Sequence, residues 1–463
     1  PTLPFPHPWN YHEPIRILET FFTGVEHESG PQRDNRYLDV PGFAPVMVTR
    51  DAAIIRAILR STGDKPGQFD RDTLPSTGIA RATGSDTLLY ANGETWRRQR
   101  KLSARPFSKT SLFQPEEFSS FERTFRQTIQ KRLDHLASHL AQTGGDSVEI
   151  ALEEEIKVVM LEMLVNNFFG AEVEYERIRD EFAPAIDRVI TRIVSDTVMN
   201  RFGVPLRRLP PVTPGLAKAR RDLATFERLT DLVLAQRGTD RGLWGQFESD
   251  APDEKLRSNL RVFLAGALEA TTSFAAWAIA HLSRDVELQD RLYEEVRGVD
   301  HYSPDELDKA VLLNKVLDET LRLTPSLYFL PRRPTGPTTV ETDDGRVLEM
   351  PRGTHVLLDV WHANRRESAW GEEATGFPAE AFAPDRWDQV EVRSPAARAQ
   401  LHFGFGDGAR VCPGKFLGQL EVGLTVGAIV QTFRFKAVNE VWSVRAGVST
   451  KPADGALVKL SRR

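Results

Sequence analysis

Cysteine is almost absent from this sequence: Cys412 is the only one among 463 residues. A lone cysteine excludes an intramolecular disulfide, and it excludes structural zinc and iron–sulfur sites that need several thiolates. It is also compatible with a reducing compartment, so we expect a cytoplasmic protein. No run of about 18 apolar residues stands out, and we therefore expect no membrane span.

A strong excess of charge of either sign is also missing. The chain has 60 Lys and Arg against 65 Asp and Glu, which gives a net charge of −5. This balance argues against nucleic acid as a general partner, because such partners are attracted by a clear surplus of basic residues.

The one cysteine lies in an unusual segment, Phe405-Gly-Asp-Gly-Ala-Arg-Val-Cys-Pro-Gly414. Pro413 suits the first position of a helix, so the Cys412 sulfur would lie at a helix N-terminus, where a thiol pKa is lowered. The glycines allow the backbone to turn tightly and to approach a flat ligand. Although most free cysteines are buried structural thiols, this setting favours a thiolate metal ligand, with Phe405 shielding the sulfur and Arg410 meeting a carboxylate.

The pattern Phe-x-x-Gly-x-Arg-x-Cys-x-Gly resembles the haem-binding signature of the cytochrome P-450 monooxygenases, and all five fixed positions are present. The resemblance implies that Cys412 binds the iron of haem b (iron protoporphyrin IX). Phe405, Arg410 and Gly414 would contact the cofactor. We expect a soluble, bacterial member of that family.

A second segment of the resemblance is Glu319-x-x-Arg322, whose side chains share one face of a predicted helix. An exposed pair of this kind is common on solvated helices. In the family, however, the two residues join an arginine from a later loop in a buried network. That arginine would be Arg386 here, and the network would support the loop that carries Cys412.

A third segment places Trp96 and Arg100 four residues apart on one helix. The resemblance implies that both contact one haem propionate and that Arg332 contacts the other. Arg333 competes for that role, because the register of the strand decides which side chain points inward.

Four further cations follow Trp96 in the same segment: Arg97, Arg98, Lys101 and Arg105. They are either a solvated helix face or a docking surface for an acidic electron donor, since complementary charge accelerates encounter.

The long apolar stretch from about 256 to 281 predicts a buried central helix. The family motif in this helix is Ala/Gly-Gly-x-Asp/Glu-Thr-Thr, but here Ala270 separates Glu269 from Thr271. If the threonines set the register, Thr271 is the catalytic alcohol, followed by Thr272, and Ala270 replaces the acid. If Glu269 sets it, Ala270 replaces the alcohol. The first reading is favoured, because Thr271-Thr272-Ser273 then matches the downstream family pattern.

Helical periodicity dominates the rest of the chain. Helices are expected near 13–23, 50–60, 94–105, 116–142, 148–168, 174–195, 215–236, 253–283, 285–297, 311–322 and 414–431. Strands are expected at 36–40, 45–49, 337–341, 347–350 and 354–359, with more near 432–460. We therefore predict a mainly α protein with small β-sheets (α+β), in the cytochrome P-450 fold. Haem would lie between the central helix and the Cys412 loop. Residues 1–463 would form one domain, with 1–12 as a proline-rich lead.

The resemblance implies a haem-thiolate monooxygenase that inserts one oxygen atom of O2 into an apolar small molecule. Its two electrons would come from an external ferredoxin or flavoprotein reductase. Thr271, helped by Glu269 and water, would deliver protons. Ala267, Leu268, Leu327 and Phe329, with part of 70–88, would line the substrate pocket.

Other functions fit the same motifs. The separated acid and alcohol are compatible with a peroxide-driven haem-thiolate peroxygenase. A non-enzymatic haem sensor or carrier belongs to a different class, and a haem-thiolate isomerase that works without O2 is a third alternative.

Overall fold

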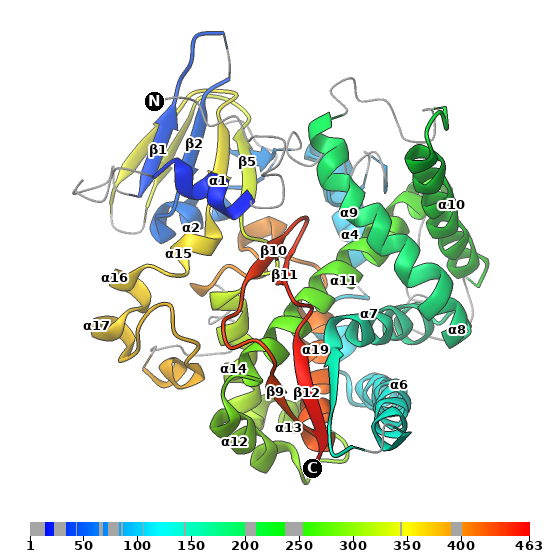
Figure 1. Ribbon diagram of the computed structural model, residues 1–463. Helices are drawn as coiled ribbons and strands as arrows, with labels where there is room; N and C mark the ends of the chain where they lie inside the picture. Colours follow the sequence, from blue (N-terminus) through cyan, green and yellow to red (C-terminus); the bar gives the residue numbers. More distant parts are fainter. Residues whose placement is uncertain are drawn as a thin grey trace.

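A computed structural model describes residues 14–22, 34–42, 44–63, 68–72, 83–84, 87–104, 106–142, 145–199, 210–236, 253–342, 345–389 and 401–463. The chain forms a helical part and a sheet-containing part, and the two lie side by side (Figure 1). The apolar helix α11 (Asp253–Leu282) runs through the helical part.

The other helices pack around α11 or lie in the sheet-containing part (Figure 1). Their bounds are α1 Pro14–Thr20, α2 Ala52–Arg60, α4 Gly93–Ala104, α5 Lys109–Leu112, α6 Pro115–Gln142, α7 Leu152–Glu162, α8 Tyr175–Arg177, α9 Ala183–Met199, α10 Pro214–Ala235, α12 Val286–Val296, α13 Pro304–Lys309, α14 Val311–Leu323, α15 Val360–Ala363, α16 Glu367–Trp370, α17 Glu372–Thr375 and α19 Lys415–Thr432. Helix α7 continues into a π-helical turn, Met163–Phe168, and a second π turn, Ile178–Phe182, precedes α9.

The largest sheet has five strands in the order β1 (Asn35–Leu38), β2 (Val46–Thr49), β8 (His355–Leu358), β5 (Leu330–Pro334) and β3 (Phe69–Arg71). Only β2 and β8 pair in parallel. The apolar face of α2 packs on this sheet through Ile54, Ile55 and Ile58. The β3–β5 register places Arg71 opposite Arg332, which brings two arginines to the sheet edge.

Three small sheets complete the fold. They consist of β4 (Val148–Ala151), β12 (Leu457–Arg462) and β9 (Phe433–Ala437), of the hairpin β10 (Val444–Ala446) and β11 (Thr450–Pro452), and of β6 (Thr338–Glu341) with β7 (Val347–Met350). The predicted mainly helical architecture with small sheets is confirmed.

Helix α11 lies at the centre of the core, where it packs against α7, α10, α14 and α19. Its segment Leu256–Leu282 is long and apolar enough to cross a membrane, with a mean hydropathy of 1.4. The expectation that no segment reaches this length and composition is therefore wrong. Since 78% of the apolar window is buried inside the protein, the segment also has the properties of an ordinary core helix.

Several element boundaries differ from the sequence prediction. Val148–Ala151 is a strand paired with β12, although it had been assigned to the helix that follows. Strand β3 had not been predicted, and β5 was missing from the expected strand ranges although Arg332 and Arg333 were expected in a strand. Segments of three and five residues with adjacent arginines or prolines give little periodic signal. Helix α19 begins at Lys415, so Pro413 precedes the helix instead of opening it.

Candidate active site

Cys412 lies in a loop that its own backbone holds in shape. Its N–H donates to the carbonyl of Phe405 at 2.9 Å, and Gly406 donates to Phe403 at 2.8 Å. Gly408 has φ +68°, and a Cβ there would lie 2.3 Å from the carbonyl oxygen of Leu59. The loop therefore requires glycine at this position, both for its conformation and for its close contact with α2.

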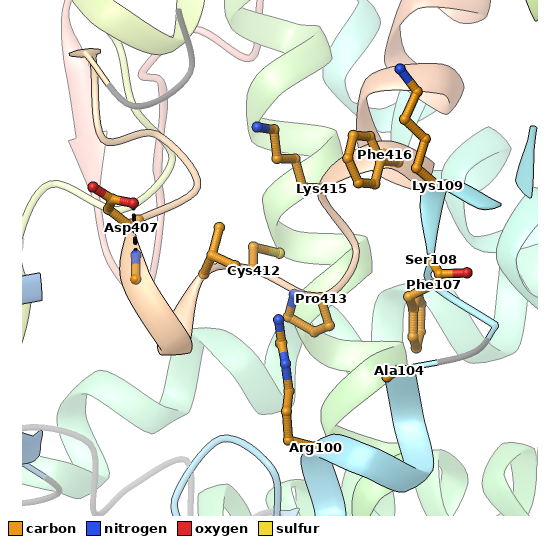
Figure 2. Close-up of a pocket in the computed structure, with 13 residues that line it drawn as sticks. Arg100, Ala104, Phe107, Ser108, Lys109, Asp407, Cys412, Pro413, Lys415 and Phe416 are labelled. Atoms are coloured by element: carbon orange, nitrogen blue, oxygen red, sulfur yellow. Dashed lines mark hydrogen bonds between the residues drawn. The ribbon is translucent and has the colours of Figure 1, made fainter. Parts of the chain in front are cut away.

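A cavity of about 460 Å³ opens beside the sulfur. Its lining residues are Arg100, Ala104, Phe107, Ser108, Lys109, Gly406, Asp407, Gly408, Val411, Cys412, Pro413, Lys415 and Phe416. Figure 2 shows Arg100 extending from α4 toward Pro413 and Cys412, with Lys415 and Lys109 on the other side. None of these lining residues comes from α11, so the cavity is not the predicted substrate pocket.

Burial raises the pKa of the Cys412 thiol above its usual value. One side of the residue faces the cavity, while protein atoms surround the others. A hydrogen bond from the backbone of Gly414 and the charges of Arg100, Arg71 and Lys415 lower the pKa but do not outweigh burial. The expected net lowering is therefore wrong for the free thiol. The surrounding donors and cations would nevertheless stabilise a thiolate that binds a metal.

Glu319, Arg322 and Arg386 lie together, fully buried, at one end of α14. Glu319 accepts hydrogen bonds from Arg322 at 2.8 and 2.9 Å and from Arg386 at 2.8 Å. Trp387 Nε1 and the backbone N–H of Ala383 donate to the same carboxylate at 3.1 and 2.9 Å. Both arginines also donate to backbone carbonyls, so the buried charges are paired and hydrogen-bonded.

This network reaches the Cys412 loop through Asn364. Arg322 donates to the Asn364 carbonyl at 2.7 Å, and the Asn364 side chain donates to the carbonyl of His402 at 2.7 Å. His402 Nδ1 in turn accepts from Gly404 N–H at 3.0 Å. The geometry therefore connects α14 to the start of the loop by a short series of hydrogen bonds.

The charges of Arg71 and Arg100 act on the Cys412 thiol, and Arg332 lies near Arg71 and Arg410. Arg332 is buried and donates to Thr62 Oγ1 at 3.1 Å, while Arg333 is exposed. Burial and the nearby charges of Arg71 and Arg410 place the pKa of Arg332 well below its usual value. The strand register thus turns Arg332, and not Arg333, toward the site.

Arg410 joins the loop to the N-terminal end of α4. It donates to the Ala91 carbonyl at 2.9 Å and to Asn92 Oδ1 at 2.7 Å, and its guanidinium lies 4.0 Å from the centre of the buried Trp96 ring. Arg100 is half-buried on the same helix. Burial lowers its pKa, and the charge of Cys412 raises it.

Arg71 was missed by sequence reasoning. Burial lowers its pKa, and Tyr90 and Cys412 raise it, so the guanidinium lies near both. Its Nε and the buried hydroxyl of Tyr90 have no hydrogen-bond partner within the described ranges. The only signal in the sequence was an arginine in an unassigned segment, and its role depends on pairing with β5.

These observations test whether the site fits an iron porphyrin. Arg71 and Arg100 lie near the thiol, Arg332 lies near Arg71 and Arg410, and Asp70 lies 3.9 Å from Arg410. An anionic planar ligand with two carboxylates would neutralise this charge and provide acceptors for Arg71 and Tyr90. The residues present therefore fit haem b.

On α11 the structure separates Glu269 from Thr271. Thr271 Oγ1 donates to the Ala267 carbonyl at 2.7 Å. Side chains two residues apart on a helix point in directions that differ by about 200°. The Glu269 carboxylate accordingly points away from Thr271 and binds Ser449 and Lys451. Thr272 is fully buried, and its hydroxyl has no partner among the described residues.

The predicted pocket residues divide into two groups. Leu327 is 43% exposed, and Ala267 and Phe329 are partly exposed. Leu268 is 2% exposed and packs in the main core, so its side chain faces away from the open side of α11. Most of 70–88 and Arg105 lie outside the described residues.

Phe405 and Gly414, which were predicted to contact the cofactor, lie at the two ends of the Cys412 loop. Phe405 is partly buried and packs edge-on against Phe274 of α11, with ring centres 6.4 Å apart. Gly414 precedes α19, and a Cβ there would lie 3.9 Å from the Phe107 ring.

Comparison with known proteins agrees with this geometry. The cytochrome P-450 family description matches residues 37–455. Cytochrome P-450 734A5 of Oryza sativa subsp. japonica is 27% identical over 85% of this chain and 73% of that protein. The ent-isokaurene C2/C3-hydroxylase of the same organism is 24% identical over 86% of this chain and 78% of that protein. Pentalenene oxygenase of Streptomyces avermitilis is 24% identical over 77% of this chain and 75% of that protein.

The match extends over most of the chain and includes the Cys412 loop, the Glu319 network and α11. The chain therefore belongs to the cytochrome P-450 family, and it is a haem-thiolate monooxygenase with haem b as its cofactor.

Proposed function

We propose that this monooxygenase oxidises an apolar small molecule bound between α11 and the Leu327 segment, with Cys412 as the iron ligand and Thr271 as the proton-delivering alcohol. The observation that carries the proposal is the position of Cys412 beside a cavity and near the charges of Arg100 and Arg71. Bound haem supplies the activation of O2 with two electrons, and the thiolate favours O–O cleavage.

The chain's own residues would hold the cofactor by its edge. Arg71, Arg100 and Arg332 would donate to the propionates, and Tyr90 would add a hydroxyl donor. Trp96 and Arg410 would position that edge, because Arg410 already stacks on Trp96 and binds the turn before α4. Phe405 would keep water away from the sulfur. The Glu319, Arg322 and Arg386 network would keep the loop rigid.

Proton delivery would depend on Thr271. Its hydroxyl back-bonds to Ala267, a carbonyl on the partly open face of α11. Ala270 occupies the position next to it that carries an acid in the family pattern. Because the Glu269 carboxylate binds Ser449 and Lys451, water would have to pass on the protons that the acid of the family pattern delivers. We assign Thr272, which is fully buried, a packing role.

The substrate would be apolar, because Ala267, Leu327 and Phe329 present hydrocarbon surface. Leu268 would support this surface from behind. Fatty acids, terpenoids, steroids and aromatic ethers all satisfy this description.

The electron donor would be a separate acidic protein, a ferredoxin or a flavoprotein reductase. Arg97, Arg98 and Lys101 are exposed on α4. Arg100 of the same helix extends toward Cys412 (Figure 2). A single cysteine supports a cytoplasmic location, where thiols stay reduced. A single-domain, soluble bacterial protein without nucleic-acid or membrane partners remains part of this proposal. Similar proteins occur in both plants and bacteria, so the relatives do not favour a bacterial origin.

A peroxygenase is the second candidate, since the acid beside Thr271 is replaced by Ala270. Haem-loaded protein should be tested with an apolar compound under two conditions. One contains ferredoxin, its reductase and O2, and the other contains hydrogen peroxide alone. The proposal expects product in the first condition. Product only with peroxide would favour the peroxygenase, and a Soret band insensitive to every apolar compound would favour a haem sensor or carrier.

A further inference from the structure

Helix α11 carries a largely buried charged cluster that the monooxygenase reaction does not account for. Its members lie on five elements and are Glu153, Lys157, Asp187, Glu269, Arg445 and Lys451. Glu153, Lys157, Glu269 and Lys451 are buried, whereas the side chains of Asp187 and Arg445 are 32% and 54% exposed. The buried members are costly unless paired, so their pairing indicates a specific role.

Glu269 is the α11 member of the cluster, and both of its oxygens are occupied. Oε1 accepts from Ser449 Oγ at 2.7 Å, and Oε2 accepts from Lys451 Nζ at 2.9 Å. Glu269 is 9% exposed and Lys451 6%. Ser449 and Lys451 flank Thr450 at the start of β11, so a single carboxylate holds the turn of the β10–β11 hairpin.

The same face of α11 binds the hairpin at two further points. Ser273 Oγ donates to the Thr450 carbonyl at 2.6 Å, and Trp277 Nε1 donates to Thr450 Oγ1 at 3.1 Å. Glu269, Ser273 and Trp277 are spaced by four residues, which is the spacing of one helix face. Thr271 is not on this face.

Lys451 extends the connection beyond the hairpin. Its Nζ lies 3.7 Å from Glu153 of α7 and 3.8 Å from Asp187 of α9. Arg445 of β10 binds Glu153 at 2.7 Å, and Lys157 binds Asp187 at 3.2 Å. The hairpin is thus fastened to α7, α9 and α11 through charges.

The hairpin turn adjoins the proposed substrate pocket. Tyr328 donates its hydroxyl to the Gly447 carbonyl at 3.0 Å, and Thr450 N–H donates to the Ser326 carbonyl at 2.9 Å. Leu327 lies between these two anchored residues and is the exposed apolar side chain of the segment. A displacement of the hairpin would therefore move Leu327.

We propose that Glu269 is a positioning residue that determines substrate specificity: its pair with Lys451 sets the place of the β10–β11 hairpin and hence the shape of the pocket around Leu327. It acts through the hairpin and does not deliver protons. The inference rests on the proposed function for the location of the pocket.

The test uses full-length, haem-loaded protein with Glu269→Gln, Lys451→Met and the double variant. Glu440→Gln, the same change at an exposed site after β9, is the matched control. The first readout is hydrogen–deuterium exchange of residues 444–452. The second is the dissociation constant of imidazole and of 4-phenylimidazole, measured from the Soret shift that each ligand causes. Exchange does not depend on haem, so it still reports on the hairpin if the cofactor assignment fails.

Either single change should accelerate exchange in the hairpin by about tenfold. The effects should be less than additive in the double variant, because each single change already removes the Glu269–Lys451 pair, while Lys451→Met also removes the contacts with Glu153 and Asp187. The dissociation constant of the bulky 4-phenylimidazole should change by about fivefold, and that of imidazole by less than about twofold. Ser449→Ala, a milder change, should give a smaller effect in the same direction.

Unchanged exchange in both single variants, or strictly additive effects in the double variant, would overturn the inference. A second outcome would also overturn the inference. Glu269→Gln would keep normal hairpin exchange and ligand selectivity but release as much peroxide as Thr271→Val, which would mean that Glu269 acts in proton delivery.

Discussion

The two sides of the haem site are held in different ways. On the Cys412 side, glycine conformations, short backbone hydrogen bonds and the Glu319 network fix the loop. On the α11 side, a regular helix presents Thr271 and a small-residue face, while its acid binds a distant hairpin. The iron-ligand side thus retains the family pattern, and the side that faces substrate departs from it.

This difference indicates which side of the site tolerates amino-acid changes. Glu319 forms hydrogen bonds to three side chains at once, so any change there leaves buried charges without partners. Glu269 is free to serve another purpose, because a helix backbone satisfies its own hydrogen bonds and needs no acid at that position. The four predictions below compare the two sides, beginning with the largest expected effect.

Cys412→Ser should abolish monooxygenase activity, because the hydroxyl cannot replace the thiolate that pushes electron density onto iron. The absorption spectrum of the reduced carbon monoxide complex should lose the position typical of thiolate-bound haem. Circular dichroism should show that the helical fold is retained. If the variant kept that spectrum, Cys412 would not be the iron ligand.

Glu319→Ala should destabilise the protein by about 3–5 kcal/mol, because Arg322 and Arg386 would remain buried without a counter-charge. Urea unfolding of the haem-free protein measures this change. Glu380→Ala is the control: Glu380 also pairs with an arginine, Arg365, but is 66% exposed, and it should cost less than about 1 kcal/mol. Similar losses in both variants would mean that the network does not stabilise the loop.

Thr271→Val should reduce product formed per O2 consumed by about tenfold, with the electrons lost to peroxide, because the hydroxyl that would move protons is gone. Thr272→Val removes a hydroxyl that has no partner in the described structure. It should leave coupling intact and unfolding free energy unchanged or slightly higher. Equal uncoupling in the two variants would exclude a special role for Thr271.

Glu421→Gln should change the pH dependence of stability. Burial in α19 raises the pKa of Glu421 to about 8, so the folded protein holds this proton over a range where the unfolded chain, with a pKa near 4.5, releases it. The resulting stability is fully present below pH 4.5 and is lost as pH rises to about 8, on the order of 5 kcal/mol. Urea midpoints at about pH 6 and about pH 8.5 should therefore differ less in the variant than in the wild type. An identical pH dependence would refute the raised pKa.

Much of the site was predictable where neighbours in the sequence are also neighbours in space. Cys412 with its glycines, and Glu319 with Arg322, form local patterns whose geometry follows from one loop and one helical turn. Strand register was open, because Arg332 and Arg333 point to opposite sides and only the pairing of β5 with β3 decides between them. For the same reason Arg71 could not be recognised.

The sequence by itself determined the family, the cofactor and the mainly helical class, because these depend on short motifs and on periodicity, and the same motifs predict Cys412 as the iron ligand. Only the tertiary structure decided where the charges of α11 are used, since Ser449 and Lys451 lie 180 and 182 residues beyond Glu269. A carboxylate responds to whichever cation folding brings within about 3 Å, and no local pattern in the chain specifies that partner.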